Sequence, residues 1–345
     1  MKTPFALLMN DLHIDNDCCT DFRLNWNEAL TICKERNIDE IIIGGDLWTS
    51  RASQALQTML TVRECLAQAE KMGISVTIAS GNHCKVDQCS TDSYNTIFCD
   101  MKGVEVVQHW AAYYLGDLLF VVFSHFPESG EFQKVFSEFE DSCLKADKIK
   151  KQNVILYLHE GIHGALGDMD LPDELPQDMF DGYFKVLVGH YHNRVRIKGT
   201  SIEYIGSSRQ LSFGEDEDKG YTVLYEDGTT EFIKNKVNIR YETITLTYKQ
   251  LQDGDYQLRD DSRYRYRLKL ICTGEQMRTI DKKALIEGGF HKIVFSTEKT
   301  VASEIKDTEM EKKFDKVGIQ REYVTFCDNK GIESRIGLSY LNKIN

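Results

Sequence analysis

The sequence has little of what marks disulfide-held or membrane-embedded proteins. Only 4 of its 345 residues are proline, and no apolar run approaches the roughly 20 residues that a membrane-spanning helix needs, so no membrane association is expected. The short apolar stretch at residues 5–9 lacks a small-residue cleavage site, which favours a first strand over a signal peptide. The ten cysteines include no Cys-x-x-Cys pair. We therefore expect reduced thiols in a cytoplasmic compartment.

Positive charge is also scarce. Forty-two Lys and Arg residues stand against 54 Asp and Glu residues, which gives a net charge of −12. This balance argues against indiscriminate nucleic-acid binding, because the electrostatic part of such binding needs a basic surface. It leaves open a local basic groove, and also a metal site that supplies positive charge itself.

Short apolar strands and amphipathic helices alternate through the first 80 residues. Apolar runs predict buried strands at residues 5–10, 41–43 and 74–79. Apolar residues at helical spacing predict helices over residues 22–36 and 52–71. This alternation predicts βαβ units with a largely parallel sheet.

The pattern changes after residue 100. Strands are expected at residues 104–107 and 118–123, and the lack of a long helix between them favours antiparallel pairing. A mostly helical segment over residues 131–151 follows. Further strands are predicted at residues 154–158, 184–188, 195–197, 202–205, 221–225 and 230–233. Two sheets packed face to face, with helices outside, fit this order.

A second pattern change places a domain boundary near residue 240, between residues 1–240 and 241–345. Within the second part, residues 262–271 alternate strictly, and one face carries Arg263, Arg265, Arg267 and Lys269. That face either meets a DNA backbone or is the solvated, charged face of an edge strand. A helix at residues 280–287, a strand at 292–296 and a final helical stretch after Gly331 complete a smaller α+β unit.

Side chains with oxygen and nitrogen donors follow the ends of five predicted strands. The pattern is plainest at residues 186–192, where an apolar run ends in Gly189 and is followed by His190 and His192. The carboxyl ends of strands border the crevice where open α/β folds bind ligands. The other donors at strand ends are Asp11, His13, Asp46, Asn82, His83 and His159.

These eight donors contain no thiolate and suit manganese, iron or zinc. Eight groups exceed what one ion needs. Two cations bridged by a carboxylate form a clamp for in-line displacement at phosphorus, and Asp46, with a glycine pair before it, is the natural bridge. Taken singly, each Asp or Asn is more often a turn residue or a helix cap. The whole set in this order is hard to obtain by accident.

The motifs Asp-x-His, Gly-Asp, Gly-Asn-His, a lone His and Gly-His-x-His, in this order, resemble those of the calcineurin-like metallophosphoesterases. The segments Tyr204-Ile-Gly-Ser207 and Gln210-Leu-Ser-Phe-Gly-Glu215 are similar to those of the SbcD-type DNA repair nucleases and the related recombination-endonuclease subunits of large phages. The resemblance covers about residues 5–235. It implies an αββα two-sheet sandwich with a smaller C-terminal α+β capping domain.

The resemblance also implies a function. It is that of a two-metal DNA nuclease, with Mn²⁺ as the expected ion, which hydrolyses phosphodiester bonds at DNA ends or hairpins by a metal-activated hydroxide. The family works with an SbcC-like ATPase in DNA repair and recombination, in the bacterial cytoplasm or in that of the host of a phage. Homodimers form in this family, and the helix at residues 52–71 lies where such a dimer would pack.

The family's functional residues carry over by motif. The resemblance implies that one metal is held by Asp11, His13, Asp46 and His192. The other metal would be held by Asp46, Asn82, His159 and His190. In the same way, His83 would act on the scissile phosphate, either stabilising the transition state or protonating the leaving oxygen.

One residue departs from the family pattern. Family members usually carry an acidic residue after the histidine of Gly-Asn-His, and here that residue is Cys84. A thiol cannot stabilise an imidazolium as a carboxylate does, so His83 is either a weaker acid–base group or is supported by a nearby acid such as Asp87. Two alternatives therefore stay open beside the nuclease: a phosphomonoesterase or small-molecule phosphodiesterase of the same superfamily, and a catalytically weakened DNA-end adaptor.

Overall fold

The computed structural model of the chain describes residues 2–128, 130–167, 174–296, 323 and 327. The chain forms two compact units. The larger unit comprises Met1–Thr243 and Leu258–Arg267, and the smaller comprises Ile244–Gln257 and the chain from Leu268. In the part of the chain that is described, no helix has the length and apolar character needed to cross a membrane.

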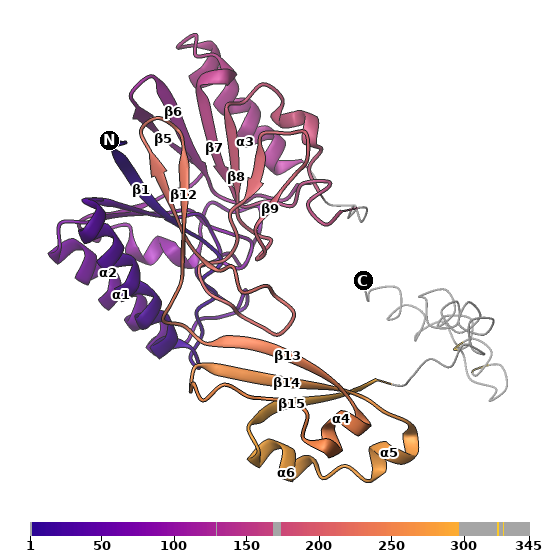
Figure 1. The fold of residues 1–345 in the computed structure, drawn as a ribbon. Coiled ribbons are helices and arrows are strands. Elements are labelled where there is room, and N and C mark those ends of the chain that lie inside the picture. The colour runs from indigo at the N-terminus through magenta and orange to yellow at the C-terminus, as the bar shows by residue number, and fades with distance from the viewer. Residues whose placement is uncertain (1, 129, 168–173, 297–322, 324–326, 328–345) are drawn as a thin grey trace. The chain divides into compact units, whose positions relative to one another are not determined.

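The first sheet of the larger unit has six strands (Figure 1). In spatial order they are β12 (Thr230–Lys234), β11 (Gly220–Tyr225), β1 (Pro4–Met9), β2 (Glu40–Ile43), β3 (Ser75–Ile78) and β4 (Val104–Val106). Strands β1 to β4 are parallel, and β11 is antiparallel to both β1 and β12. The crossover helices are α1 (Cys19–Arg36) and α2 (Leu56–Lys71). They allow parallel pairing because each returns the chain to the start of the next strand.

The second sheet also has six strands. Their order is β5 (Trp110–Leu115), β6 (Leu118–Phe123), β7 (Val154–Leu158), β8 (Lys185–Val188), β10 (Ile202–Tyr204) and β9 (Val195–Arg196). Strands β6, β7, β8 and β10 are parallel, whereas β5 and β9 are antiparallel to their neighbours. Helix α3 (Glu131–Phe139) runs into a π-helical turn (Glu140–Lys145). Short 3₁₀ turns occupy Tyr94–Phe98, Lys151–Asn153 and Gln177–Phe180.

Two sequence predictions in this unit are wrong, and one strand was not predicted. Strand β4 does not pair with β6 but lies parallel to β3. The antiparallel partner of β6 is β5, which the sequence analysis did not predict. Helix α2 begins at Leu56 rather than at residue 52, because the Ser50 hydroxyl accepts hydrogen bonds from the N–H groups of Ala52 and Ser53 and holds that segment as a turn.

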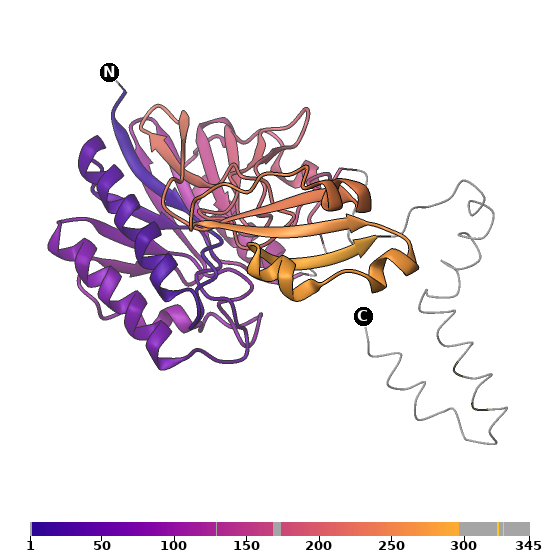
Figure 2. The same cartoon turned by 60° about the horizontal axis from the view of Figure 1, so that its bottom comes forward.

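Alternating side chains build three apolar layers. On β1, Ala6 and Leu8 face a core between the two sheets that also contains Phe120 and Tyr157. Leu7 and Met9 belong to a second core that contains residues of α1 and α2. A third core joins the other sheet to α3. Figures 1 and 2 show these helices on the outer faces of the sheets. The predicted αββα sandwich is therefore confirmed.

A three-stranded sheet follows in the order β13 (Arg240–Thr247), β14 (Tyr264–Ile271) and β15 (Phe290–Ser296). Because β14 is the central strand, the prediction that its charged face belongs to an edge strand is wrong. Three short helices accompany the sheet: α4 (Tyr248–Asp253), α5 (Gly274–Arg278) and α6 (Lys282–Glu287). The predicted helical stretch after Gly331 lies outside the described residues.

Candidate metal centre

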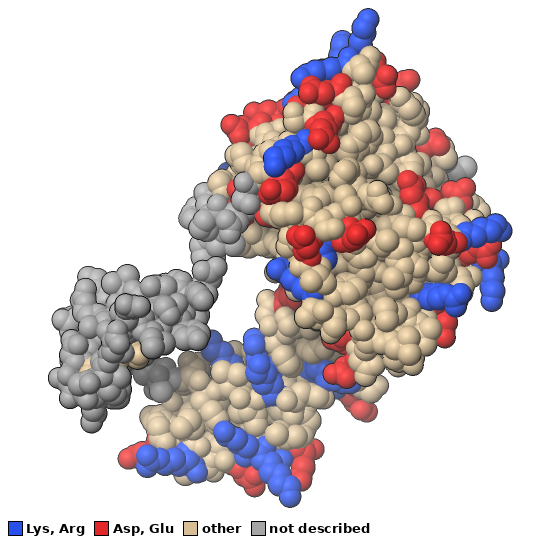
Figure 3. Space-filling model, turned by 180° about the vertical axis from the view of Figure 1, so that it is seen from behind, with Lys and Arg blue, Asp and Glu red and all other residues tan. Residues whose placement is uncertain are grey.

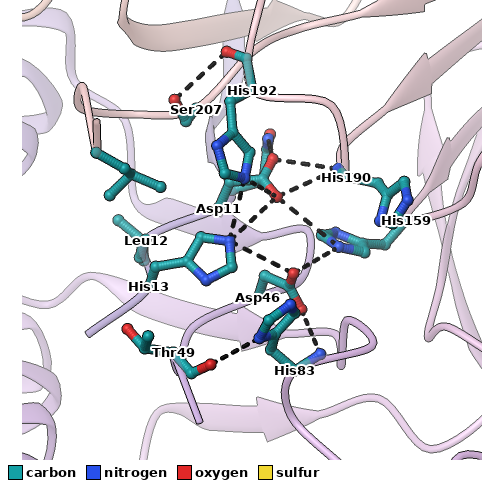
Figure 4. Close-up of polar contacts among 12 residues, drawn as sticks. Asp11, Leu12, His13, Asp46, Thr49, His83, His159, His190, His192 and Ser207 are labelled. Carbon is teal, nitrogen blue, oxygen red and sulfur yellow. Dashed lines mark hydrogen bonds and ion pairs between the residues drawn. The ribbon is translucent and has the colours of Figure 1, made fainter. Parts of the chain in front are cut away.

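The predicted site residues lie in the loops that leave the carboxyl ends of strands from both sheets, and the fold brings these loops together (Figure 4). The loops are tight. Six non-glycine residues of the described chain have a positive φ, and four of them are Asp11 (51°), His13 (42°), Asp46 (44°) and His190 (87°). Such conformations are unfavourable for residues with a Cβ and concentrate at functional sites. The backbone strain therefore points to the same residues as the motifs do.

Asp46 lies at the centre of the cluster. Its Oδ2 atom is 3.5 Å from His13 Nε2 and 3.2 Å from His159 Nε2. Its Oδ1 atom accepts a hydrogen bond from the His83 N–H at 2.8 Å. Burial alone would raise the pKa of Asp46, but the adjacent His159 outweighs it and holds that pKa well below its usual range. Asp46 is thus an anion placed between imidazoles that arrive from different strands.

Asp11 borders the same space from the other side. Its Oδ1 atom is 3.9 Å from His13 Nε2 and 3.8 Å from the Nε2 atoms of both His159 and His192. The Nε2 atoms of His13 and His192 are themselves 3.2 Å apart. The His190 N–H donates to Asp11 Oδ2 at 3.2 Å. Both carboxylates therefore face ring nitrogens across gaps of the size that a shared cation would fill.

Groups of three possible ligands follow from this packing. In three groups the ligand atoms lie within 4.8 Å of one another: Asp11, His13 and His192; His13, Asp46 and His83; Asp11, Asp46 and His159. Among the described residues, the ring of His190 joins none of these groups. It lies edge-on to His159 with 5.6 Å between ring centroids. The structure thus brings together the residues that were predicted to hold the first metal. The His190 ring lies further out than the other residues predicted to hold the second metal.

Two observations test whether this site fits metal ions. The Nε2 atom of His159 is buried and has no hydrogen-bond partner among the described residues. Burial alone would lower the pKa of His159, but the charges of Asp46 and Asp11 outweigh it and raise that pKa to about 9. An unpartnered nitrogen facing two carboxylates marks a place where positive charge is favourable. The donor set, imidazole and carboxylate without thiolate, fits hard or borderline divalent ions.

The amide of Asn82 gives the second observation. The structure places its oxygen toward Asp46 Oδ2, an arrangement of two acceptors that a cation between them would stabilise. With oxygen and nitrogen exchanged, the amide would donate to Oδ2 at 3.0 Å and accept from the Arg51 guanidinium. Burial lowers the pKa of His13 to about 4 and that of His190 to about 3. Both imidazoles are thus neutral near pH 7, as metal ligands must be.

His83 is oriented by a backbone carbonyl. Its Nδ1 atom lies 2.6 Å from Thr49 O, so Nδ1 carries the proton in this arrangement and Nε2 is left for other contacts. Cys84 is fully buried in the apolar core, where burial raises the pKa of its thiol to about 11. Asp87 accepts from the Cys89 N–H instead of contacting His83. The hypothesis that Asp87 substitutes for the missing acid is therefore wrong, and Thr49 O fills that place.

Glu215, for which the sequence predicted no role in the site, supports His192. Its Oε1 atom lies 3.1 Å from His192 Nδ1, and its Oε2 atom accepts from the Leu211 N–H at 3.0 Å. A carboxylate on the second ring nitrogen fixes the orientation of a ligand imidazole and increases its basicity. The segment that ends at Glu215 had been noted for its resemblance to the nuclease family. Sequence alone does not show which carboxylate contacts which histidine ring.

A buried polar network behind His159 was also missed. His125 Nδ1 lies 2.8 Å from Glu160 Oε2 and 3.1 Å from the backbone oxygen of His159. The Lys85 ammonium donates to the His125 oxygen at 2.5 Å and lies 3.7 Å from the ring centroid of Phe126. Burial raises the pKa of Glu160 well above its ordinary value. The network ties the loop that carries His83 to the ends of β6 and β7.

The predicted DNA-binding face of β14 is engaged in local contacts. Arg263 pairs with Asp261 at 2.7 Å, Arg265 donates to the Ser262 oxygen at 2.6 Å, and Arg267 donates to Thr243 Oγ1 at 3.0 Å. Lys269 is exposed. On the face of the larger unit that Figure 3 shows, basic side chains are scattered among acidic ones. Neither observation identifies a basic groove, so DNA contact by these four residues stays a prediction.

No protein-family model and no curated protein matches the chain. Many solved structures are similar to part of it, among them the following two. A dimetal phosphatase from Danio rerio shares 9% identity with a TM-score of 0.42, over 65% of this chain and 93% of its own. The nuclease MPE from Pseudomonas putida shares 14% identity with a TM-score of 0.31, over 64% of this chain and 84% of its own. At these TM-scores the fold assignment depends on the sheet order described above.

Proposed function

We propose that this chain is the nuclease subunit of a DNA repair or recombination complex, hydrolysing phosphodiester bonds at DNA ends or hairpins with two divalent cations, Mn²⁺ foremost. The observation that carries the proposal is the position of Asp46 Oδ2 between His13 Nε2 and His159 Nε2, at 3.5 and 3.2 Å. The motif order and the segment from Tyr204 to Glu215 support the nuclease branch of the superfamily.

The chain's own residues would divide the work. Asp11, His13, Asp46 and His192 would hold one cation, and Asp46, Asn82, His159 and His190 the other. Such cations, when bound, neutralise the phosphate and lower the pKa of water. Glu215 holds the His192 ring, and Thr49 O holds the His83 ring through Nδ1, which leaves Nε2 for the substrate. To donate from Nε2 to the phosphate or the leaving oxygen, His83 would have to carry a second proton, as the imidazolium.

The proposed partners are an SbcC-like ATPase and a second copy of this chain, with DNA as substrate, in the cytoplasm. Support for a homodimer comes from α2, where Leu56 is 67% exposed and Leu60 is 40% exposed. Leu24 of α1 is a further exposed apolar side chain, with 45% of its surface exposed. Light scattering after size exclusion would show a dimer in the wild type and a monomer in a Leu56→Glu, Leu60→Glu variant.

A manganese-dependent assay on linear double-stranded DNA tests the function, with bis(p-nitrophenyl) phosphate and p-nitrophenyl phosphate in parallel. Cleavage of DNA and of the diester, lost in His83→Ala and Asp46→Asn, supports the nuclease. Cleavage of either nitrophenyl ester without DNA cleavage supports a phosphatase or small-molecule phosphodiesterase, the reading that the scattered basic charge favours. Metal binding without cleavage of any substrate, even with the ATPase, supports the adaptor.

A further inference from the structure

A cleft opens beside the His13 and His192 end of the metal centre. Its volume is about 440 Å³, within the range of about 300–1,000 Å³ that small-molecule sites occupy. The cleft is continuous with the candidate site because both imidazoles line it. All of its lining residues belong to the larger unit. A group attached to a phosphate at the metal centre would therefore have room here.

Three residues of the cleft lining, Leu211, Ile239 and Tyr241, are apolar or aromatic, and the position of Tyr241 is fixed. The Tyr241 backbone exchanges two hydrogen bonds of 2.9 Å with the Gln210 amide. The Tyr241 ring packs edge-on against Phe213, with ring centroids 5.1 Å apart. A fixed, half-buried tyrosine ring offers a stacking surface for a nucleobase of any sequence.

Four residues of the lining are acidic, Asp15, Asp17, Asp21 and Glu215, and part of their charge is already neutralised. Asp21 pairs with Arg209 at 3.1 Å, and Glu215 lies 3.1 Å from His192 and 3.7 Å from Lys219. Arg209 is the one lysine or arginine in the lining, and its guanidinium also donates to the backbone oxygens of Leu12 and His13.

Two acids of the lining, Asp15 and Asp17, have no ion-pair partner among the described residues. Asp15 is held in place, because its Oδ1 atom accepts from the N–H groups of Asp17 and Cys18, both at 3.0 Å. Asp17 is exposed. The cleft lining thus keeps two carboxylates whose charge no ion pair among the described residues offsets.

We infer that this cleft binds an uncharged nucleoside at a strand end and rejects a strand whose phosphates continue through it. The inference rests on the proposed nuclease function and names the substrate end that the site prefers. A base would stack on Tyr241 while its sugar passes Asp15 and Asp17. A further phosphate would meet these two carboxylates at short range, where like charges repel.

Dinucleoside monophosphates test the inference, either unphosphorylated or carrying one terminal phosphate at the 5′ or the 3′ end. We expect kcat/KM to fall about fivefold for one of the two phosphorylated forms, and the effect to shrink as salt is raised. Asp15→Asn, Asp17→Asn should remove the difference without lowering hydrolysis of bis(p-nitrophenyl) phosphate. Asn retains the capping oxygen of residue 15, and Asp100→Asn, at an exposed site outside the cleft, is the matched control.

Tyr241→Ala should raise KM for the unphosphorylated dinucleotide severalfold and leave Mn²⁺ binding unaffected, whereas Tyr241→Phe should behave as wild type. Tyr114→Ala, at a residue that is 71% exposed and outside the lining, is the control. Equal rates for all three dinucleotides, or no response to either set of variants while diesters are cut, would overturn the subsite. If no diester is cut at all, the proposed function itself fails.

Discussion

Gly45 and His159 lie so close that residue 45 has no room for a side chain. A Cβ atom on Gly45 would be 2.1 Å from His159 Nδ1, and Gly45 has a φ of +123°. A Cβ atom on the preceding Gly44 would likewise lie 2.1 Å from Tyr157 Cζ. The glycine pair before Asp46 therefore lets the end of β7 pack against the end of β2, which brings His159 to Asp46.

Gly45→Ala should cost at least about 2 kcal/mol of stability, since strain and overpacking combine, and should weaken Mn²⁺ binding because His159 must move. Thermal unfolding and calorimetric titration with Mn²⁺ measure the two effects. Gly73→Ala is the matched control: Gly73 also has a positive φ, +76°, but nothing lies within 4 Å of its Cβ position. Retained Mn²⁺ affinity in Gly45→Ala would contradict the packing argument.

Mn²⁺ should stabilise the wild-type protein, because the metal-free centre holds the two buried carboxylates of Asp11 and Asp46 close together among possible imidazole ligands. A ligand that binds only the folded state adds about 2.7 kcal/mol at a hundredfold excess over its Kd, so Tm should rise by about 5 °C or more. EDTA should reverse the shift. Asp46→Asn, which keeps the size of the side chain, should abolish it, whereas Asp100→Asn should not. An unchanged Tm with Mn²⁺ would count against the metal centre.

Cys84→Asp should destabilise the protein and should not raise activity. The thiol lies fully buried in the same apolar core as Trp48 and Phe98, so a carboxylate there would lose its hydration at a cost of about 2–4 kcal/mol. His83 gains nothing, since Thr49 O occupies its Nδ1 side. Circular dichroism melting and the DNA assay check both points, with Cys84→Ala as the control. A gain in cleavage would restore the hypothesis that the thiol is the defect.

The strand-end motifs could be predicted from the sequence because parallel strands have their carboxyl ends at the same edge of the sheet. An Asp or His that follows an apolar run and a glycine is therefore expected at that edge. Thr49 O was not readable, since every residue has a carbonyl and only the path of the loop aims this one at His83. Strand β5 was missed because Trp110–Leu115 lies at a sheet edge, where its small and aromatic residues are half exposed and show no buried run.

Glu40→Gln should stabilise the protein at neutral and higher pH. Glu40 is partly buried at the start of β2, and its Oε1 atom accepts from Thr77 Oγ1 at 2.8 Å. Burial raises the pKa of Glu40 from 4.5 to about 7. The folded protein thus holds this proton more tightly than the unfolded chain does, and stability falls as pH rises from about 4.5 to about 7.

Glutamine keeps the size of the side chain and cannot ionise. The Tm values of Glu40→Gln and wild type should therefore agree near pH 4.5, diverge as the pH rises to about 7 and keep a constant gap above it, where the variant should be more stable by about 1–2 kcal/mol after solvent screening. Calorimetric melts of the metal-free proteins across this range measure the difference. Glu226→Gln, at an exposed position, should follow wild type throughout. A constant difference between Glu40→Gln and wild type at every pH would mean that Glu40 is not the group that titrates.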